Sequence, residues 1–523
     1  MCKAPGSGLC DASDALAAAG DRAKYAKWLL LVVAAGAAVR IALVLSSSIW
    51  YDEAASIFQA SQPLPVMFHM LRNAVGEPLY LLLLKIWMLL LGNGEHATAL
   101  LSAVISTAGI VVIYLFAGWL LGPEVGLMSA LMLAFNATDL HNATNVRFYA
   151  LVNMLAILSW WTFLRHCISE KSPWPFAVVT VLGLYTHTYF YFLVFAQICC
   201  LVVFYRRRIL SMLPTLALAG LAYLPWFLFV FLHQLRGAIG TNMPPIGGLG
   251  GAVWVFGCSL VSKMTHLGPT AIAVPFALTV FFAFWVFVIA QGLRGIQLSA
   301  PVQRIEVLLF GFTVSIGVPI LISLARPIFL AGRYDVIGLA AVVVSVACGL
   351  DALLRRIGRR SLYVAVVAVI VLSVAPWIRW LGSGRLDGDR RIIQQVGTMM
   401  TERGVEVFTG FAALPALYYM DQLGIPCTRR FFLPGELAQD LNFQDRKYMQ
   451  ENAALQEEAA RMISDLAGQD WDHLFFFYTD VPAMRPIRVL FEQRFNLDQV
   501  LPVPQHPWGP LYRDILILSK KSA

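Results

Sequence analysis

The chain has 523 residues, of which 59% are hydrophobic and 13% are charged, and its mean hydropathy is +0.69. Soluble domains carry about 25% charged residues, so this composition excludes a soluble globular protein and indicates an integral membrane protein. The formal net charge is +8, but the basic residues form short clusters between apolar segments, which excludes nucleic acid as the expected partner. The cysteines show no CxxC pair or metal-ligand spacing, so neither a disulfide framework nor a zinc site is expected.

The apolar segments are long enough to predict a polytopic α-helical membrane protein, because a spanning helix needs about 20 mostly apolar residues. We expect about eleven spans, at residues 28–48, 97–121, 125–141, 148–164, 174–190, 191–205, 209–232, 269–293, 305–325, 334–350 and 361–381. No small-residue cleavage site follows the first apolar run, so the first span is expected to be a retained anchor.

The segment 78–92 decides the predicted topology. It is 15 residues long and contains Lys85, too short to cross a bilayer, so we expect a helix at the membrane surface or dipping into it. The later Lys and Arg clusters then all lie on the cytoplasmic side with the N-terminus, as membrane proteins prefer. When the spans are counted from a cytoplasmic N-terminus, four segments lie on the opposite, outer side: 49–96, 142–147, 233–268 and 326–333.

Three regions follow from these patterns. We expect a cytoplasmic segment at 1–27, a transmembrane domain at 28–382 whose first outer loop is 49–96, and a small extracytoplasmic α/β domain at 383–523. The last region is more polar than the rest. Its expected strands are 405–410, 473–480 and 514–520, and its expected helices are 446–467 and 485–495. The Gly/Pro-rich stretch 240–252 is typical of a mobile loop.

Polar residues at the ends of apolar spans are candidates for function. Asp52 and Glu53 follow the first span. Asp52 could cap the helix that follows, and a cap would not prevent it from acting in catalysis. Glu77, Tyr80 and Lys85 lie in the next cluster, where Lys85 could instead extend from a surface helix to the membrane interface.

Arginines on the expected outer side favour an anionic partner. Arg147 lies beside Asn145 and Tyr149, while Arg326 and Arg333 lie in the segment before Tyr334. Guanidinium groups bind phosphate through two parallel hydrogen bonds, so these side chains facing the carboxylates would suit a phosphate-bearing substrate. His187 stands among tyrosines, a setting in which a histidine is more often a hydrogen-bonded structural residue than a base or a ligand.

Six short motifs in this order resemble the GT-C membrane glycosyltransferases. The motifs are "WYDEA" (50–54), "GEPLYLLLLKIW" (76–87), "NVRFYAL" (145–151), "LGLYTHTYF" (182–190), "YLPW" (223–226) and "RPIFLAGRY" (326–334). The resemblance is to the branch that contains the dolichyl-phosphate-mannose protein mannosyltransferases and the lipid A aminoarabinose and galacturonic acid transferases. It covers residues 28–350.

The resemblance implies transfer of a sugar from a polyprenyl-phosphate carrier to a lipid, glycan or protein acceptor, with inversion, on the outer face of the cytoplasmic (inner) membrane. It implies a multi-pass protein of the cell envelope that modifies lipopolysaccharide or another glycan. Asp52 matches the catalytic first-loop acid and Glu53 its neighbour. The implied carrier-phosphate and substrate residues are Arg333, Tyr334, Arg147, Lys85 and Arg326, then Glu77, Tyr80, Asn145, Tyr149 and His187.

Two departures from the family pattern leave alternatives open. Glu77 replaces the first proline of a "PPLY"-like motif, and Asn145 stands where relatives often carry an acid. The second departure weakens a two-acid mechanism and leaves open whether a divalent cation (Mg²⁺ or Mn²⁺) takes part. A transporter or flippase of lipid-linked sugars is one alternative, although its ionisable groups would be expected near the middle of the membrane. A GT-C-like scaffold that binds without catalysis is the other.

Overall fold

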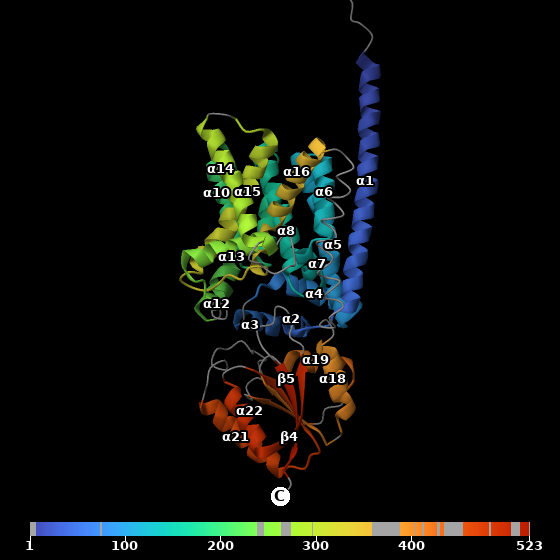
Figure 1. The fold of residues 1–523 in the computed structure, drawn as a ribbon, viewed down its shortest axis with the longest axis vertical. Coiled ribbons are helices and arrows are strands. Elements are labelled where there is room, and N and C mark those ends of the chain that lie inside the picture. Colours follow the sequence, from blue (N-terminus) through green and yellow to red (C-terminus); the bar gives the residue numbers. More distant parts are fainter. Residues whose placement is uncertain are drawn as a thin grey trace, which may run out of the picture.

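The computed structural model describes residues 7–73, 76–237, 245–262, 273–294, 297–357, 388–401, 403–409, 413–425, 429–433, 453–480, 483–503 and 513–521. In this part of the chain, a helical bundle stands above a small sheet domain (Figure 1). The helices that run along the bundle are α1 (Ser7–Ser46), α5 (Glu95–Leu121), α6 (Pro123–Ala134), α8 (Tyr149–Ser169), α9 (Trp174–Leu184), α10 (Phe190–Phe204), α11 (Ile209–Trp226), α14 (Ala273–Leu293), α15 (Ala300–Ile322) and α16 (Leu339–Ile357).

The polytopic helical fold is confirmed. Among the described residues, seven helical segments are long and apolar enough to cross a membrane, and several shorter apolar helices accompany them. The expected span 125–141 is interrupted because α6 ends before Phe135 and Asn136 starts a new helix, α7 (Ala137–Thr144). The Asn136 side chain accepts a hydrogen bond from the Asp139 amide at 3.0 Å, as an N-cap residue does. The expected span 361–381 lies outside the described residues.

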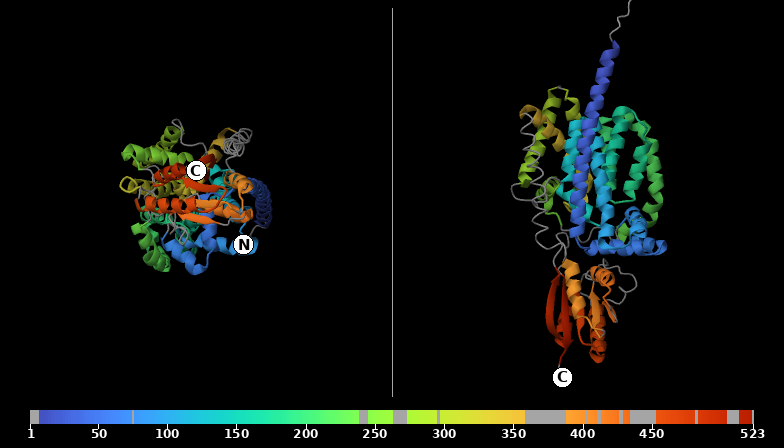
Figure 2. Two further views of the ribbon diagram at one scale, coloured as in Figure 1. Left: turned by 90° about the horizontal axis from the view of Figure 1, so that it is seen from below. Right: turned by 90° about the vertical axis from the view of Figure 1, so that its right-hand side faces the viewer.

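Short helices lie across the end of the bundle that faces the sheet domain (Figure 2). These are α2 (Tyr51–Ser61), α3 (Leu64–Asn73) and α4 (Pro78–Leu91). Helix α4 has 14 residues and lies across the bundle end, unlike the helices that run along the bundle; its place at the membrane surface stays a prediction. Helices α12 (Leu232–Gly237) and α13 (Gly248–Ser262) lie at the same end (Figure 1).

The loop expected at 240–252 is only partly one. Residues 248–252 form the first turns of α13, so the prediction is wrong there because the glycines are followed by an apolar helical run. Residues 240–244 lie outside the described residues.

The C-terminal region is an α/β domain, as predicted. Its five strands are β1 (Val405–Thr409), β2 (Arg430–Leu433), β3 (Leu474–Thr479), β4 (Phe495–Val503) and β5 (Arg513–Lys520). They form one sheet in the order β2-β1-β3-β5-β4, with β2, β1 and β3 parallel and β5 antiparallel to both neighbours. Its helices are α18 (Gly388–Met399), α19 (Ala413–Gln422), α21 (Ala453–Gly468) and α22 (Arg485–Arg494).

Both faces of this sheet are covered, because alternate residues of a strand point to opposite faces. Val407 and Phe476 pack in one apolar cluster with residues of α21 and α22. Phe408 and Phe477 belong to another cluster, which includes α18 and α19 and continues into the bundle. The sheet domain is therefore joined to the bundle through its α18–α19 layer.

Hydrogen bonds fix the sheet domain to the end of the bundle. The Tyr419 hydroxyl accepts from the Ile49 amide at 2.6 Å and donates to Glu95 Oε2 at 2.8 Å. Glu95 also forms an ion pair with Arg390 of α18. The Tyr418 hydroxyl donates to the Asn93 carbonyl at 3.0 Å. These contacts lie directly beside α2, the helix that carries Asp52 and Glu53.

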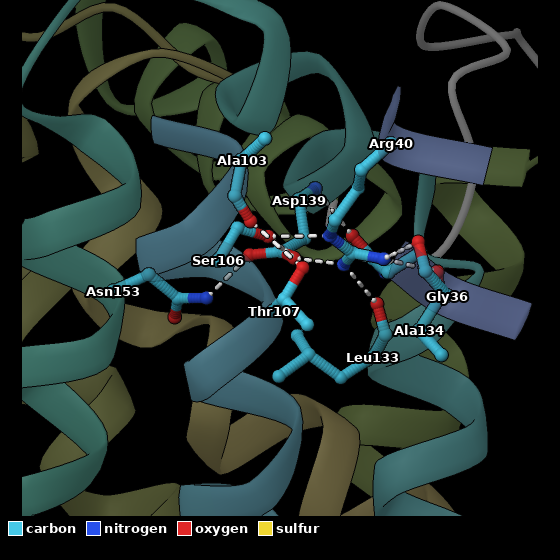
Figure 3. Close-up of polar contacts among 10 residues, drawn as sticks. Gly36, Arg40, Ala103, Ser106, Thr107, Leu133, Ala134, Asp139 and Asn153 are labelled. Carbon is cyan, nitrogen blue, oxygen red and sulfur yellow. Dashed lines mark hydrogen bonds and ion pairs between the residues drawn. The ribbon is translucent and has the colours of Figure 1, made fainter. Parts of the chain in front are cut away.

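A buried ion pair holds α1 against the break between α6 and α7 (Figure 3). Arg40 is fully buried and pairs with Asp139 at 2.5 Å. All five guanidinium hydrogens have acceptors, which are Ser106 Oγ, Asp139 Oδ2 and the carbonyls of Gly36, Leu133 and Ala134. Asp139 also accepts from Ser106 and Asn153. Arg40 thus donates to the Leu133 and Ala134 carbonyls at the end of α6, where helix carbonyls lack their usual amide partners four residues on.

Candidate active site

Asp52 and Arg333 form an ion pair at the bundle end, between segments 281 positions apart in the sequence. Asp52 lies in the first turn of α2, and Arg333 directly precedes the 3-10 helix Tyr334–Gly338. The Arg333 Nε donates to the Tyr149 hydroxyl at 2.7 Å, which fixes the orientation of the guanidinium. The side chains of Asp52 and Arg333 are 14% and 17% exposed, so the pair is largely shielded from water.

Glu53 has different contacts although it is adjacent to Asp52. Its Oε2 accepts from the Trp50 amide at 3.0 Å and its Oε1 from the Val146 amide at 2.7 Å. The side chain is buried, and burial raises the pKa of Glu53 to about 8 against the opposing effect of these two amides. The helix begins at Tyr51 with Trp50 as its N-cap residue, so the predicted capping role of Asp52 is wrong. Glu53 pairs with the free amide at the helix start instead.

Arg147 contacts the same helix from another side. Its Nη1 donates to the Asp52 carbonyl at 3.4 Å and to Ser56 Oγ at 3.2 Å, and its guanidinium lies 4.9 Å from the centre of the Phe148 ring. Its buried Nε has no hydrogen-bond partner among the residues that the structure describes. Two guanidinium groups therefore contact Asp52, one through its carboxylate and one through its backbone.

Aromatic side chains form one wall of the site. Tyr334 stacks on Tyr189 with ring centres 5.0 Å apart, and His187 lies 5.8 Å from Tyr334 and 6.5 Å from Tyr149. His187 Nδ1 accepts from the Tyr189 amide at 3.0 Å, so the ring hydrogen of neutral His187 is on Nε2. Burial, with Arg147 and Arg333 nearby, lowers the pKa of His187 to about 3. His187 is therefore neutral at physiological pH and can donate a hydrogen bond but is a weak base.

Four other predicted residues lie farther from the ion pair or serve the local structure. The Tyr80 hydroxyl is 2.9 Å from Ser102 Oγ, and Asn145 Oδ1 accepts from the Trp50 indole at 3.3 Å. Lys85 donates to the Ala60 and Gln62 carbonyls at 3.0 and 2.8 Å, at the opposite end of α2 from Asp52. Arg326 is exposed at the start of the segment that leads to Arg333. A phosphate contact for Lys85 or Arg326 stays a prediction.

Glu77 is buried at the start of α4. Its Oε1 accepts from the Thr188 hydroxyl at 3.1 Å, whereas Oε2 has no partner within the described part of the chain. Burial raises the pKa of Glu77 to about 8, opposed by the Thr188 hydroxyl and by the Trp226 indole N–H, which lies near without completing a hydrogen bond. Thr188 connects Glu77 to His187 and thus to the aromatic wall.

The residues of the site do not match what a divalent cation requires. In the described ranges, no group of three or more His, Cys, Asp and Glu side chains is placed to hold a metal ion. Asp52 faces a guanidinium, and both Glu53 oxygens accept from backbone amides. We therefore derive no step through a metal ion.

Several contacts of the site were not predicted from the sequence. Thr188, which holds Glu77, lies within a quoted motif but carries no signal that separates it from other threonines. The tyrosines of α19 lie more than 300 positions from the loop they contact. Arg40 and Asp139 both lie inside segments that were expected to span the membrane, and their pairing was not predicted, although an Arg inside an apolar run is itself a signal of a buried partner.

Comparison with known proteins supports this architecture. Residues 75–233 match the family model described as dolichyl-phosphate-mannose-protein mannosyltransferase. Among curated proteins, no sequence is significantly similar to the chain. The matched segment includes Glu77, Arg147 and His187, while Asp52 and Arg333 lie outside it.

Solved structures are similar over nearly the whole chain. Crystal structures of ArnT from Cupriavidus metallidurans, bound to undecaprenyl phosphate and in the apo state, have TM-scores of 0.57 and 0.55. Both are 13% identical, and the match covers 94% of this chain and 98% of theirs. The oligosaccharyltransferase AglB from Archaeoglobus fulgidus, in complex with an inhibitory peptide and a dolichol-phosphate, has a TM-score of 0.47 at 12% identity, covering 94% of this chain and 74% of that one. The similarity to ArnT confirms the expected GT-C fold.

Proposed function

We propose that the chain is an inverting glycosyltransferase that moves a sugar from a polyprenyl-phosphate carrier to an acceptor on the outer face of the cytoplasmic membrane. The observation that carries the proposal is the Asp52–Arg333 ion pair, with Arg147 on the same helix start. This arrangement brings the Asp52 carboxylate together with two guanidinium groups, which are suited to bind phosphate. The match of residues 75–233 to a mannosyltransferase family and the GT-C fold support the same reaction class.

The reaction requires the ion pair to open. The carrier phosphate competes with Asp52 for Arg333, because guanidinium binds both anions through the same fork. Release of Asp52 leaves a carboxylate beside the bound donor, free to accept a proton. Binding of the donor thereby prepares the base, and the pair is the resting arrangement.

The chemical step then balances without a general acid. The acceptor oxygen or nitrogen attacks the anomeric carbon from the face opposite the phosphate, and its proton passes to Asp52. The bond between the anomeric carbon and the phosphate oxygen breaks, and its electron pair remains on the phosphate. Arg333 and Arg147 stabilise this negative charge. Neutral His187 and the rings of Tyr149 and Tyr334 shape the space around the transferred sugar.

The arrangement of charges supports an outer location for the site. The Asp52–Arg333 pair and the sheet domain share one end of the bundle, and the basic run 206–208 lies between α10 and α11, which meet at the other end (Figures 1 and 2). Since basic clusters favour the cytoplasmic side, we assign the site and the sheet domain to the outer side. Helices α2 and α4 lie across this end of the bundle, next to the sheet domain.

The test uses the purified full-length chain in lipid nanodiscs with labelled polyprenyl-phosphate sugars and a mixture of lipid, glycan and peptide acceptors. We expect the parent to consume donor and Asp52→Asn to turn over about 10²–10⁴ times more slowly, since general-base catalysis contributes about that factor. The matched control is Asp351→Asn, which affects an exposed Asp–Arg pair on α16 and should keep parental turnover.

A binding measurement separates a catalytic from a structural role. Asp52→Asn should bind undecaprenyl phosphate at least as tightly as the parent, because Arg333 is freed from its carboxylate partner. Unchanged turnover in Asp52→Asn would refute the proposed base. Donor binding and movement across the bilayer without any sugar transfer would instead identify a transporter, and binding without either would identify a scaffold.

A further inference from the structure

A second group of polar side chains surrounds Glu77. It is formed by Glu77 at the start of α4, Tyr191 of α10, Tyr223 and Trp226 of α11, and Gln234 of α12, and we call it the Glu77 cluster. Its members come from four helices. Gln234 Nε2 donates to the Leu71 and Gly76 carbonyls at 2.7 and 3.1 Å, which places it beside Glu77. The cluster is thus anchored next to Glu77 by backbone contacts.

Aromatic rings pack closely in this cluster. Tyr191 and Tyr223 meet edge to face with ring centres 5.6 Å apart, and Tyr185 lies 5.1 Å from Tyr223 and 6.1 Å from Trp226. The Glu77 carboxyl is near the Trp226 indole and the three phenols. Rings and one acid therefore share a small volume at the bundle end.

Each member of the Glu77 cluster carries a buried polar atom without a partner among the described residues. These atoms are Glu77 Oε2, Tyr191 Oη, Tyr223 Oη, Trp226 Nε1 and Gln234 Oε1. The Tyr191 and Tyr223 hydroxyls lie near each other, and the Trp226 indole lies near Glu77, but neither contact completes a hydrogen bond. The side chains of Glu77, Tyr223, Trp226 and Gln234 are all less than a tenth exposed. Most buried polar groups in proteins are hydrogen-bonded, and one ordered water satisfies about 2–4 of them, so five such atoms in one place indicate a larger hydrogen-bonding ligand.

The chemistry of these atoms identifies the ligand class. The cluster mixes donors and acceptors, none of its members is basic, and aromatic rings flank the polar atoms. The absence of a basic member disfavours phosphate, and the unpaired polar atoms disfavour a hydrocarbon tail. A sugar ring has hydroxyl groups at its rim and apolar C–H faces that pack on aromatic rings, so it matches both features.

The cluster also lies at a suitable place relative to Asp52 and Arg333. Thr188 donates to Glu77 and directly follows His187, which packs on the aromatic wall next to Tyr149, the partner of Arg333. A donor whose phosphate binds Arg333 would direct its sugar along this wall towards Glu77. Side-chain contacts through Thr188, His187 and Tyr149 thus connect the cluster to Arg333.

We propose that the Glu77 cluster binds the uncharged sugar ring of the carrier-linked donor, with Glu77, Tyr223, Trp226 and Gln234 pairing with its hydroxyl groups. This inference rests on the proposed function and extends it to residues of α11 and α12. It makes the cluster the part of the site that selects the sugar, because a site built to hydrogen-bond hydroxyl groups rejects analogues that lack them.

The experiment compares equilibrium binding of bare undecaprenyl phosphate with that of undecaprenyl phosphate carrying neutral hexoses or pentoses. The full-length chain is used in nanodiscs. We expect the parent to prefer at least one sugar-bearing carrier by about tenfold or more, as several hydrogen bonds of typical strength would give. Tyr223→Phe and Glu77→Leu should each reduce this preference about 3–10-fold and leave the affinity for bare carrier unchanged.

Two further variants make the result specific. Tyr205→Phe is the control for Tyr223→Phe. Tyr205 follows the C-terminal end of α10, away from Tyr191 and the cluster, so this variant should keep the parental preference for sugar-bearing carrier. Glu77→Gln should keep most of it, since an amide offers a donor and an acceptor as the protonated acid does. If Glu77→Gln loses as much as Glu77→Leu, the ligand group is cationic and the neutral-sugar assignment is wrong.

The remaining outcomes are also decisive. A parent without any preference for sugar, or variants with parental preference, would mean that ordered water alone pairs with the cluster. Because binding is measured at equilibrium, this result would leave the Asp52-dependent turnover test intact. If Glu77→Leu fails to fold, Tyr223→Phe decides, because it removes one hydroxyl and leaves the ring packing in place.

Discussion

The buried Arg40–Asp139 ion pair allows a direct test of how α1 is held to the bundle. Asp139→Ala would remove the acceptor of three hydrogen bonds, from Arg40, Ser106 and Asn153. It would also leave the Arg40 guanidinium fully buried without a counter-charge. Four of its five hydrogens would keep their acceptors, so the loss comes mainly from the uncompensated charge.

The expected cost is large. Breaking a buried ion pair by removing one partner typically destabilises a protein by about 3–5 kcal/mol, and the unsatisfied Ser106 and Asn153 donors act in the same direction. Replacing both charged residues, as in Arg40→Met with Asp139→Leu, should recover most of this loss, because no buried charge remains. With the single variants Arg40→Met and Asp139→Leu, this double variant and the parent form a double-mutant cycle.

The assay is thermal unfolding of the full-length chain in nanodiscs, with retained binding of undecaprenyl phosphate as the check on the native state. Asp351→Ala serves as the control, because it breaks an exposed pair with Arg355 within one helix and should shift the midpoint far less. The reasoning would be refuted if Asp139→Ala lowered the midpoint no more than Asp351→Ala. It would also be refuted if the double variant were less stable than Asp139→Ala.

Three further predictions concern the site and its surroundings. Tyr149→Phe removes the acceptor that orients Arg333 Nε, so the KM for the carrier-linked donor should rise about 3–10-fold with a smaller change in kcat, measured by steady-state kinetics. The pKa of Glu77 is raised from 4.5 to about 8, so its contribution to stability is present at low pH and is lost as pH rises through this window. Unfolding midpoints between pH 5 and pH 8 should therefore fall less in Glu77→Gln than in the parent, and equal slopes would contradict this. A membrane-impermeant thiol reagent should label Asn93→Cys from outside the cell and Arg207→Cys only after permeabilisation, and the reverse pattern would invert the assigned topology.

Length and composition predicted the bundle well, because crossing a bilayer imposes a minimum apolar length. The helix at 78–91 was correctly separated from the spans on this basis. The span expected at 125–141 was wrong since Asn136 caps a new helix inside an apolar run. Side-chain hydrogen bonds of Asn136 and Arg40 stabilise that break, and hydropathy averaged over a window does not register them.

The sheet domain also shows where a prediction from apolar runs fails. The strands β1, β3 and β5 were predicted because they lie inside the sheet and read as apolar runs. The strands β2 and β4 were missed, and they are the two edges of the sheet. Edge strands carry polar residues that discourage pairing with other chains, and the middle of β4 is exposed accordingly. The apolar signal is therefore weakest where the sheet ends.

Asp52 and Glu53 show why a site is harder to predict than a fold. In a helix of 3.6 residues per turn, successive side chains point about 100° apart, so adjacent carboxylates face different neighbours. One faces Arg333, and the other accepts from the Trp50 and Val146 amides. Their spacing in the sequence indicated two acids in one place, whereas the helix separates their surroundings. Glu53 fixes the start of α2 and the turn before Arg147. This leaves Asp52 as the carboxylate that, in the proposed reaction, a substrate phosphate displaces from Arg333.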